Sequence, residues 1–151
     1  MPKFFLKKNK KTFLQNVEYN DVDFFSLKGY KTWCKCVKIY DGDTITVVFY
    51  YNKQPHKFRV RLANIDTAEL RSDNPIEMHV AKVARDSLIN IIDDNLIYIE
   101  CLEFDKYGRL LANLYSNKKM YKSFNDMLIE NGLAYKYEGK TKLKFEEWYK
   151  N

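Results

Sequence analysis

The stretch Lys57-Phe58-Arg59-Val60-Arg61-Leu62-Ala63-Asn64-Ile65-Asp66-Thr67-Ala68-Glu69 joins a strand pattern directly to a cluster of acidic side chains. Charged and apolar residues alternate over 57–62, which is the period-two pattern of a half-buried strand. Two carboxylates and a hydroxyl then fall within four positions, where the alternation stops. Because a strand fixes the backbone and the loop after it exposes side chains, this junction is a candidate site for a metal ion and an anionic substrate. A solvated strand end followed by a polar turn is the alternative.

Upstream of this stretch the sequence predicts two more strands. Residues 32–40 and 44–51 are rich in β-branched and aromatic side chains, and Asp41-Gly42-Asp43 interrupts them. A hairpin turn at 52–55 leads into the strand that contains Arg61. Because short connections join the three strands in sequence, we expect an antiparallel meander.

Downstream, the sequence predicts a long helix and then a second group of strands and short helices. Asn74 can cap the helix, Pro75 suits its first position, and apolar residues recur at helical spacing as far as Ile91. This helix should end near residues 93–95. The remaining expected elements are strands at 96–104 and 110–115 around a turn at 105–109, a helix from about 122 to 131 terminated by Gly132, and a last short helix capped by Thr141.

These elements together indicate the fold class. Five strands in an antiparallel meander, with a helix after the third and another near the end, are typical of a mainly β, α+β chain that forms a five-stranded barrel of OB-fold type with about three helices. A chain of 151 residues suits one domain with its own core. We expect residues 31–151 to form this domain and residues 1–30 to be a basic, partly ordered N-terminal extension.

The net charge of +6 is unevenly distributed. The first twelve residues carry +5 and no acid, whereas the other 139 carry +1. The lysines of this N-terminal arm are Lys3, Lys7, Lys8, Lys10 and Lys11. Such an arm can bind nucleic acid without reading its sequence, or can serve as a solubilising tail, and both interpretations stay open.

The three cysteines favour a reducing compartment. Cys34, Cys36 and Cys101 are an odd number in a spacing that matches no usual disulfide framework. Half of a zinc clip is the alternative for the first two, but only His56 and His79 offer nitrogen ligands, so ordinary strand cysteines are favoured. The sequence shows no secretion signal and no apolar run that could span a bilayer, so an intracellular location is expected.

Three separated motifs resemble, in their order, the staphylococcal nuclease (thermonuclease) family. They are Asp41-Gly42-Asp43-Thr44, Arg61-Leu62 through Asp66-Thr67-x-Glu69, and Asp105-Lys106-Tyr107-Gly108-Arg109. Asn125 with Leu128, followed by Gly132-Leu133-Ala134, is similar to the family's second helix and its exit. The resemblance covers roughly residues 32–137. One departure is Ala68, where the family usually has proline; alanine relaxes the backbone but removes no functional group.

The resemblance implies a calcium site among the acids. Asp43 and Asp66 would hold the ion, and the backbone carbonyl of Thr67 would be a further ligand. Glu69 would lie near the metal through a water molecule and act as the base or position the attacking water. Hard oxygen ligands of this kind suit Ca²⁺, which acts as a Lewis acid and a template.

The resemblance also implies two cationic clamps for the scissile phosphate, Arg61 and Arg109. A planar guanidinium donates two parallel hydrogen bonds to a phosphate, whose negative charge grows during attack. Arg59 lies on the same strand face and is a rival, but the five-residue distance from Arg61 to Asp66 matches the family spacing. The pair Lys106 and Tyr107 is a candidate contact for a terminal phosphate or sugar.

By this resemblance the protein is expected to be a monomeric, calcium-dependent nuclease that hydrolyses DNA and RNA with little sequence preference. The main alternative is a non-catalytic OB-type nucleic-acid-binding module, since small barrels bind strands through charge and aromatic side chains alone. Such a binder would have no need of Arg61, Glu69 and Arg109 beside two aspartates. A calcium-binding structural module, the third hypothesis, does not explain the paired arginines.

Overall fold

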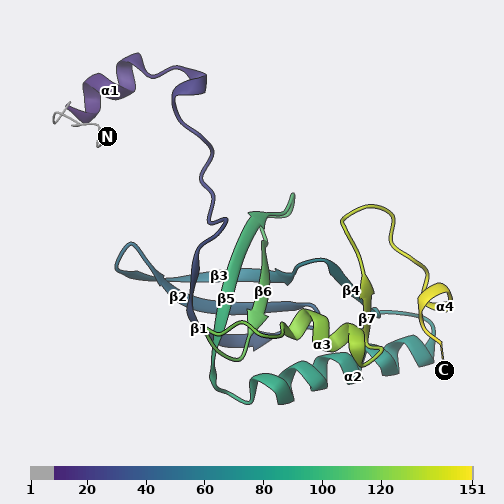
Figure 1. Ribbon diagram of the computed structural model, residues 1–151. Coiled ribbons are helices and arrows are strands. Elements are labelled where there is room, and N and C mark those ends of the chain that lie inside the picture. The colour runs from purple at the N-terminus through teal and green to yellow at the C-terminus, as the bar shows by residue number, and fades with distance from the viewer. Residues whose placement is uncertain (1–8, 151) are drawn as a thin grey trace.

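The computed structural model describes residues 9–150, in which five strands close into a barrel and two helices, α2 (Pro75–Ile92) and α3 (Phe124–Glu130), pack against it (Figure 1). The other helices are α1 (Lys10–Asn16), the short 3-10 helix η1 (Tyr19–Asp21) and α4 (Phe145–Trp148). The strands are β1 (Lys31–Ile39), β2 (Thr44–Tyr51), β3 (Gln54–Leu62), β4 (Ile65–Thr67), β5 (Leu96–Phe104), β6 (Leu110–Tyr115) and β7 (Ala134–Lys136). The expected five-stranded barrel is confirmed.

The barrel has the strand order β1-β2-β3-β6-β5, and β5 pairs back with β1. Four of these pairs are antiparallel, but β3 and β6 are parallel, with Arg61 opposite Leu111. A purely antiparallel meander is therefore wrong at this one contact. The reason is the crossover: α2 carries the chain from β3 to β5, and the β5–β6 hairpin then returns β6 in the direction of β3.

Alternating side chains of the strands fill the barrel. Ile45, Val47 and Phe49 of β2 point inward and are at most 2% exposed, whereas the residues between them face outward. Leu88 of α2 and Leu128 of α3 are fully buried in the same core, so both helices pack against the barrel. Burying each such leucine stabilises the fold by about 2 kcal/mol, which fixes the two helices relative to the strands.

Helix α2 begins and ends where its sequence predicts. The Asn74 side chain accepts hydrogen bonds from the backbone N–H groups of Ile76 and Glu77, and Pro75 occupies the first helical position. The helix ends at Ile92, and its C-cap residue Asp93 adopts a left-handed conformation with φ 44°. No helix within residues 9–150 is long and apolar enough to cross a membrane.

The shorter elements differ from the sequence-based expectation at their ends. The β2–β3 turn is only Asn52-Lys53, both at positive φ, and residues 54 and 55 already belong to β3. Helix α3 begins at Phe124 because Ser123 caps it, and not at residue 122. Thr141 does not cap the last helix; Lys144 precedes it and the helix begins at Phe145.

A small two-stranded sheet, β4–β7, was not expected because each strand has only three residues. It pairs Asp66 with Tyr135 and Thr67 with Ala134. The pairing brings the acidic stretch after β3 next to a segment some seventy residues later in the chain. This contact adds a C-terminal wall to the site described below.

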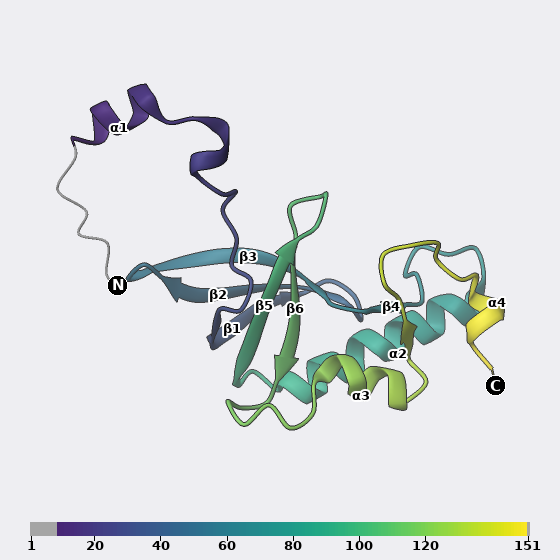
Figure 2. The same cartoon turned by 45° about the horizontal axis from the view of Figure 1, so that its top comes forward.

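The N-terminal segment stands apart from the barrel (Figure 2). Helix α1 forms where no periodicity indicated one, because the Asn9 side chain caps the backbone N–H of Lys11; none of its residues is buried. Leu27, which is 2% exposed, is the first residue of the described chain to enter the core. Lys3, Lys7 and Lys8 of the N-terminal arm lie outside the described residues.

Candidate active site

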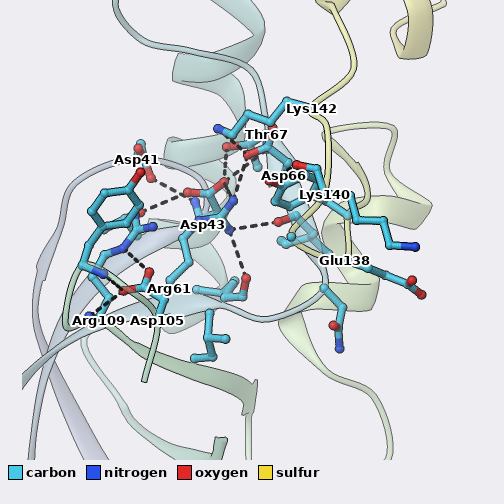
Figure 3. A pocket seen from close by; sticks show the side chains of 18 of the residues that line it. Asp41, Asp43, Arg61, Asp66, Thr67, Asp105, Arg109, Glu138, Lys140 and Lys142 are labelled. Atoms are coloured by element: carbon cyan, nitrogen blue, oxygen red, sulfur yellow. Dashed lines mark hydrogen bonds and ion pairs between the residues drawn. The ribbon is translucent and has the colours of Figure 1, made fainter. Parts of the chain in front are cut away.

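One pocket of about 580 Å³ brings together all eight site residues predicted from the sequence. Its walls come from the start of β2, the end of β3, β4, the β5–β6 turn and the segment after β7. The eight residues are Asp43, Arg61, Asp66, Thr67, Glu69, Lys106, Tyr107 and Arg109. Figure 3 labels Asp43, Arg61, Asp66, Thr67 and Arg109 among them. Segments far apart in the sequence therefore meet at one end of the barrel.

Arg61 occupies the centre of the acidic group and is only 7% exposed. Its Nη1 donates to the backbone carbonyls of Leu62, at 3.0 Å, and Ile65, at 2.9 Å, which fixes the plane of the guanidinium. Its Nη2 lies 2.8 Å from Oδ1 of Asp66 and 3.1 Å from Oδ2 of Asp43. The arginine is thus held by two carbonyls on one side and two carboxylates on the other.

Asp43 is held by the residues around it as well as by Arg61. The backbone N–H and the hydroxyl of Thr67 both donate to its Oδ2, at 3.2 and 3.1 Å, and the Thr44 hydroxyl donates to Oδ1 at 3.0 Å. Thr67, expected as a metal ligand through its carbonyl, therefore also positions this aspartate. Fixed hydrogen bonds of this kind keep the carboxylate in one orientation.

Gly42 brings the Asp43 loop close to α2. A Cβ at this position would lie 2.8 Å from Cβ of Ala84, closer than real Cβ contacts come, and 3.1 Å from Cγ2 of Thr67, which is a tight contact. The loop can approach the helix only because residue 42 has no side chain.

Asp41 is a pocket residue to which the sequence interpretation gave no separate role. Its Oδ1 accepts a hydrogen bond from the backbone N–H of Asp43 at 3.1 Å. Burial, and then the neighbouring Asp43 carboxylate, raise the pKa of Asp41 to about 6. The Asp43 carboxylate disfavours the charged form of Asp41, and a cation bound between them would relieve this repulsion.

Asp66 has two partners from the C-terminal segment that the sequence interpretation missed. The Tyr135 hydroxyl donates to Oδ2 at 2.8 Å, and burial together with this hydrogen bond raises the pKa of Tyr135 to about 12. Lys142 Nζ lies 3.1 Å from Oδ1 of Asp66 and 3.2 Å from Oε1 of Glu69. Burial alone would lower the pKa of Lys142, but its contacts with Asp66 and Glu69 outweigh it and the pKa is raised. The signal that places these residues is the β4–β7 pairing, which no local pattern shows.

Glu69 is the least constrained acid of the pocket. Its side chain is 61% exposed, and its carboxylate pairs only with Lys142 among the described residues. Its backbone N–H donates to Oε1 of Glu77 at 3.3 Å, which attaches this loop to the first turn of α2. The carboxylate can therefore change rotamer without disturbing the core.

Arg109 reaches the pocket from the turn between β5 and β6. Asp105 organises this turn: its Oδ1 accepts from the backbone N–H groups of Tyr107 and Arg109, and its Oδ2 accepts from Arg109 Nε at 2.7 Å. Burial would raise the pKa of Asp105, but these hydrogen bonds lower it overall. The Arg109 guanidinium lies 5.4 Å and Lys106 Nζ lies 5.2 Å from the ring centre of Tyr107. The two cations and the ring thus lie together in one part of the pocket lining.

Arg59, the rival of Arg61, does not line the pocket. It is exposed on the outer face of β3, opposite Thr46 of β2. The structure therefore brings Arg61, and not Arg59, to the acidic group.

The oxygen donors of the pocket suit a hard divalent cation. Asp43 Oδ2 and Asp66 Oδ1 both lie against the same nitrogen of Arg61, and carboxylate oxygens are the ligands that such a cation prefers. Within residues 9–150 no three Asp, Glu, His or Cys side chains form a ready metal cluster. In this arrangement Arg61 and Lys142 neutralise the acids. The donors fit the ion in chemistry, and binding it would require these two cations to shift.

Comparison with known proteins gives the family. Residues 59–150 match the family described as Staphylococcal nuclease homologue. The match begins within β3 and runs beyond residue 137, where the motif resemblance ends, to include α4. This protein belongs to the staphylococcal nuclease family.

Individual relatives are similar over part of the chain. "Thermonuclease" of Staphylococcus hyicus is 31% identical over 66% of this chain and 56% of its own length. "Protein ParB" of Escherichia coli is 30% identical over 67% of this chain and 55% of its own length. "Staphylococcal-like nuclease CAN1" of Arabidopsis thaliana is 30% identical over 54% of this chain and 22% of its own length. The chain thus spans little more than half of the two bacterial relatives and less of the plant one.

Proposed function

We propose that this protein is a calcium-dependent nuclease that hydrolyses phosphodiester bonds of DNA and RNA with little sequence preference. The observation that carries the proposal is the convergence of Arg61 on Asp43 and Asp66 in a pocket that also contains Arg109 and Glu69. The family and the names of the relatives, among them a thermonuclease and a nuclease, support a nuclease.

Arg61 and Arg109 are proposed to hold the scissile phosphate from two sides. Both guanidinium groups line the same pocket, and each is oriented by acidic partners, Arg61 by two aspartates and Arg109 by Asp105. Attack on a phosphodiester adds negative charge to the non-bridging oxygens, and oriented N–H donors stabilise that charge without reorganising. The backbone carbonyls of Leu62 and Ile65 keep Arg61 aimed even when its Nη2 exchanges a carboxylate for a phosphate.

Glu69 is proposed to accept the proton of the attacking water. An exposed carboxylate at the pocket rim can reach water directly, and its pairing with Lys142 keeps it beside Asp66. Asp43 and Asp66, with the Thr67 carbonyl, are the proposed ligands of the calcium ion, which when bound supplies Lewis acidity and neutralises charge at the phosphate. Lys106 and Tyr107 are proposed to contact a neighbouring phosphate or sugar, since both form the wall beside Arg109.

The rest of the chain has proposed roles that follow from its charge and cysteines. We propose residues 31–151 as a monomeric nuclease domain and residues 1–30 as an extension whose N-terminal lysines add non-specific affinity for nucleic acid. The free cysteines Cys34, Cys36 and Cys101 are consistent with the proposed reducing, intracellular location.

The test is a cleavage assay with single- and double-stranded DNA and RNA, with Ca²⁺ and with a chelator. Cleavage of all four substrates that requires Ca²⁺ is the expected result. Full activity in the chelator would overturn the metal dependence. Tight binding without cleavage under every condition would favour the non-catalytic nucleic-acid-binding module instead.

A further inference from the structure

The outer face of the β2–β3 hairpin continues from the pocket along a row of cations. Arg59 and Lys57 precede Arg61 at two-residue intervals and point to the same face of β3, where both are exposed. Their cross-strand neighbours on β2 are Thr46 and Val48, which are small and only partly buried. In both views the tip of this hairpin points away from α3 and α4 (Figures 1 and 2). Because Lys57 and Arg59 are both exposed, a ligand can reach the row.

The charge of this part of the barrel is strongly one-sided. Residues 31–62 contain seven basic and two acidic residues, which gives +5, and no acid occurs between Asp43 and Asp66. Lys31 and Lys35, on neighbouring β1, are paired with acids. Lys57 and Arg59 have no ion pair anywhere in residues 9–150. A protein surface that serves only solubility usually carries both positive and negative side chains, whereas the charged side chains of this row are all positive.

Exposed aromatic rings lie on β2 and on its neighbour β1, where Lys35 pairs with Val48. Tyr50, at the end of β2 and opposite Pro55, is 65% exposed. Trp33 of β1 is 43% exposed and packs edge-on against Tyr98, with 5.4 Å between ring centres. Large exposed rings beside unpaired cations are the combination that single-stranded nucleic acids use, because their bases are free to stack.

We infer that this face, named here the β2–β3 track and defined by Trp33, Tyr50, Lys57 and Arg59, binds the part of a single-stranded nucleic acid that lies away from the scissile phosphate. The inference extends the proposed function from the pocket to a second surface. Alternate residues of a strand are separated by about 6.4–6.8 Å, so an extended single strand can place successive phosphates against cations at every second residue. The strand would run from Arg61 past Arg59 to Lys57, with its bases toward the aromatic rings.

The test compares a double variant of the track with a charge-matched control. Lys57→Gln with Arg59→Gln removes two cations of the track, and Lys82→Gln with Lys118→Gln removes two exposed lysines elsewhere. Each protein would be titrated with a labelled single-stranded DNA of about fifteen nucleotides, in a chelator, from about 50 to 300 mM salt. The expected result is a roughly tenfold loss of affinity at low salt and a salt slope reduced by about 1.4 in the track variant only, since each lost contact on a single strand removes about 0.7.

Additional variants and a duplex ligand establish which parts of the nucleic acid the track contacts. Lys57→Arg with Arg59→Lys keeps the charge and should bind like the parent protein, and Tyr50→Ala should lose roughly tenfold in affinity with an unchanged salt slope. A duplex of the same length should bind less tightly than the single strand. Equal losses in the control pair, an unchanged slope in the track variant, or a preference for the duplex would overturn the inference.

Cleavage separates this inference from the proposed function. With a small nitrophenyl phosphodiester the track variant should turn over like the parent, whereas with the oligonucleotide its KM should rise. If the parent protein cleaves neither substrate, the proposed function fails, and the binding titrations still decide whether the track exists. If cleavage occurs and KM for the oligonucleotide is unchanged in the track variant, binding at the β2–β3 track is contradicted and the proposed nuclease function is supported.

Discussion

Lys142 places its ammonium nitrogen 3.1 Å from Oδ1 of Asp66, a proposed calcium ligand. The lysine comes from the segment after β7, and the β4–β7 pairing brings that segment to the pocket. A side-chain cation therefore lies against the carboxylate that the metal would use. A calcium ion bound there would compete with Lys142 for the negative charge of Asp66.

The first prediction is that Lys142→Met raises the affinity for Ca²⁺ by roughly threefold to tenfold, because removing a partly exposed like charge relieves repulsion of that order. Isothermal titration calorimetry measures the affinity directly, without substrate. Lys140→Met, in the same loop and also at the pocket, is the matched control and should change it less. A weaker calcium affinity in the Lys142 variant would mean that the lysine supports the metal site instead of competing with it.

The second prediction concerns the two proposed phosphate clamps. Arg61→Lys and Arg109→Lys should each reduce kcat by roughly a hundredfold or more, since an ammonium cannot replace two parallel donors in the transition state. Their effects on folding should differ. Arg61→Lys should cost about 2–3 kcal/mol in free energy of unfolding because Arg61 bonds two buried carbonyls and two carboxylates, whereas the half-buried Arg109 should cost less than about 1 kcal/mol. Wild-type turnover in a folded Arg61→Lys protein contradicts its role.

The third prediction separates the proposed base from the proposed metal ligands. Glu69→Gln should lower kcat by roughly a hundredfold or more with nucleic-acid and calcium binding kept, because it removes proton acceptance and almost no volume. Asp43→Asn and Asp66→Asn should first weaken calcium binding, so excess Ca²⁺ should restore part of their activity. Glu138→Gln, an exposed acid at the same pocket, is the control and should behave like the parent. Glu69→Gln activity recovered by calcium alone would assign that residue to the metal.

The fourth prediction concerns pH. The pKa of Asp105 in the folded protein is below its ordinary value of 3.8, so its stabilising contribution is present above that value and is lost as the pH falls through the folded pKa. Asp105→Asn should therefore lower the free energy of unfolding by about 1 kcal/mol at pH 7, with a difference that shrinks below about pH 4. Urea unfolding across this range measures it. Asp73→Asn, exposed and without a hydrogen-bond partner among the described residues, should show no such trend.

The fifth prediction is that the cysteines are dispensable for activity. Burial raises the pKa of Cys34 and of Cys101 to about 12, so both stay protonated thiols at neutral pH and are neither nucleophiles nor ready metal ligands. Replacing Cys34, Cys36 and Cys101 by alanine should cost a few kcal/mol in total through lost packing. Turnover per folded molecule should be unchanged. A folded triple variant without activity would reopen a thiolate metal site.

Local sequence patterns predicted the barrel strands and α2, since hydrophobic alternation and the Asn74-Pro75 cap are local signals. The eight residues that one pocket brings together came from the resemblance of three motifs to the staphylococcal nuclease family, and not from local patterns. The parallel β3–β6 contact could not be predicted from local patterns, because it depends on how α2 carries the chain across the barrel. The approach of Tyr135 and Lys142 to Asp66 was missed for the same reason: it requires a three-residue pairing between distant segments.

The N-terminal helix α1 could not be predicted from hydrophobic periodicity. It buries no residue, so no amphipathic period marks it, and only the Asn9 cap gives a local reason for it. Seven exposed residues form a marginal helix in water.

Because residue 42 is glycine, the loop that presents Asp43 packs directly against helix α2. Because Cβ of Ala84 would stand only 2.8 Å from a Cβ on residue 42, the side-chain sizes at these two positions are complementary and limit each other. Any substitution that thickens α2 at residue 84 pushes on the loop that presents Asp43, even though the helix contributes no side chain to the pocket. Within the family, we therefore expect substitutions at residues 42 and 84 to be correlated. A larger side chain at one position would require a compensating change at the other.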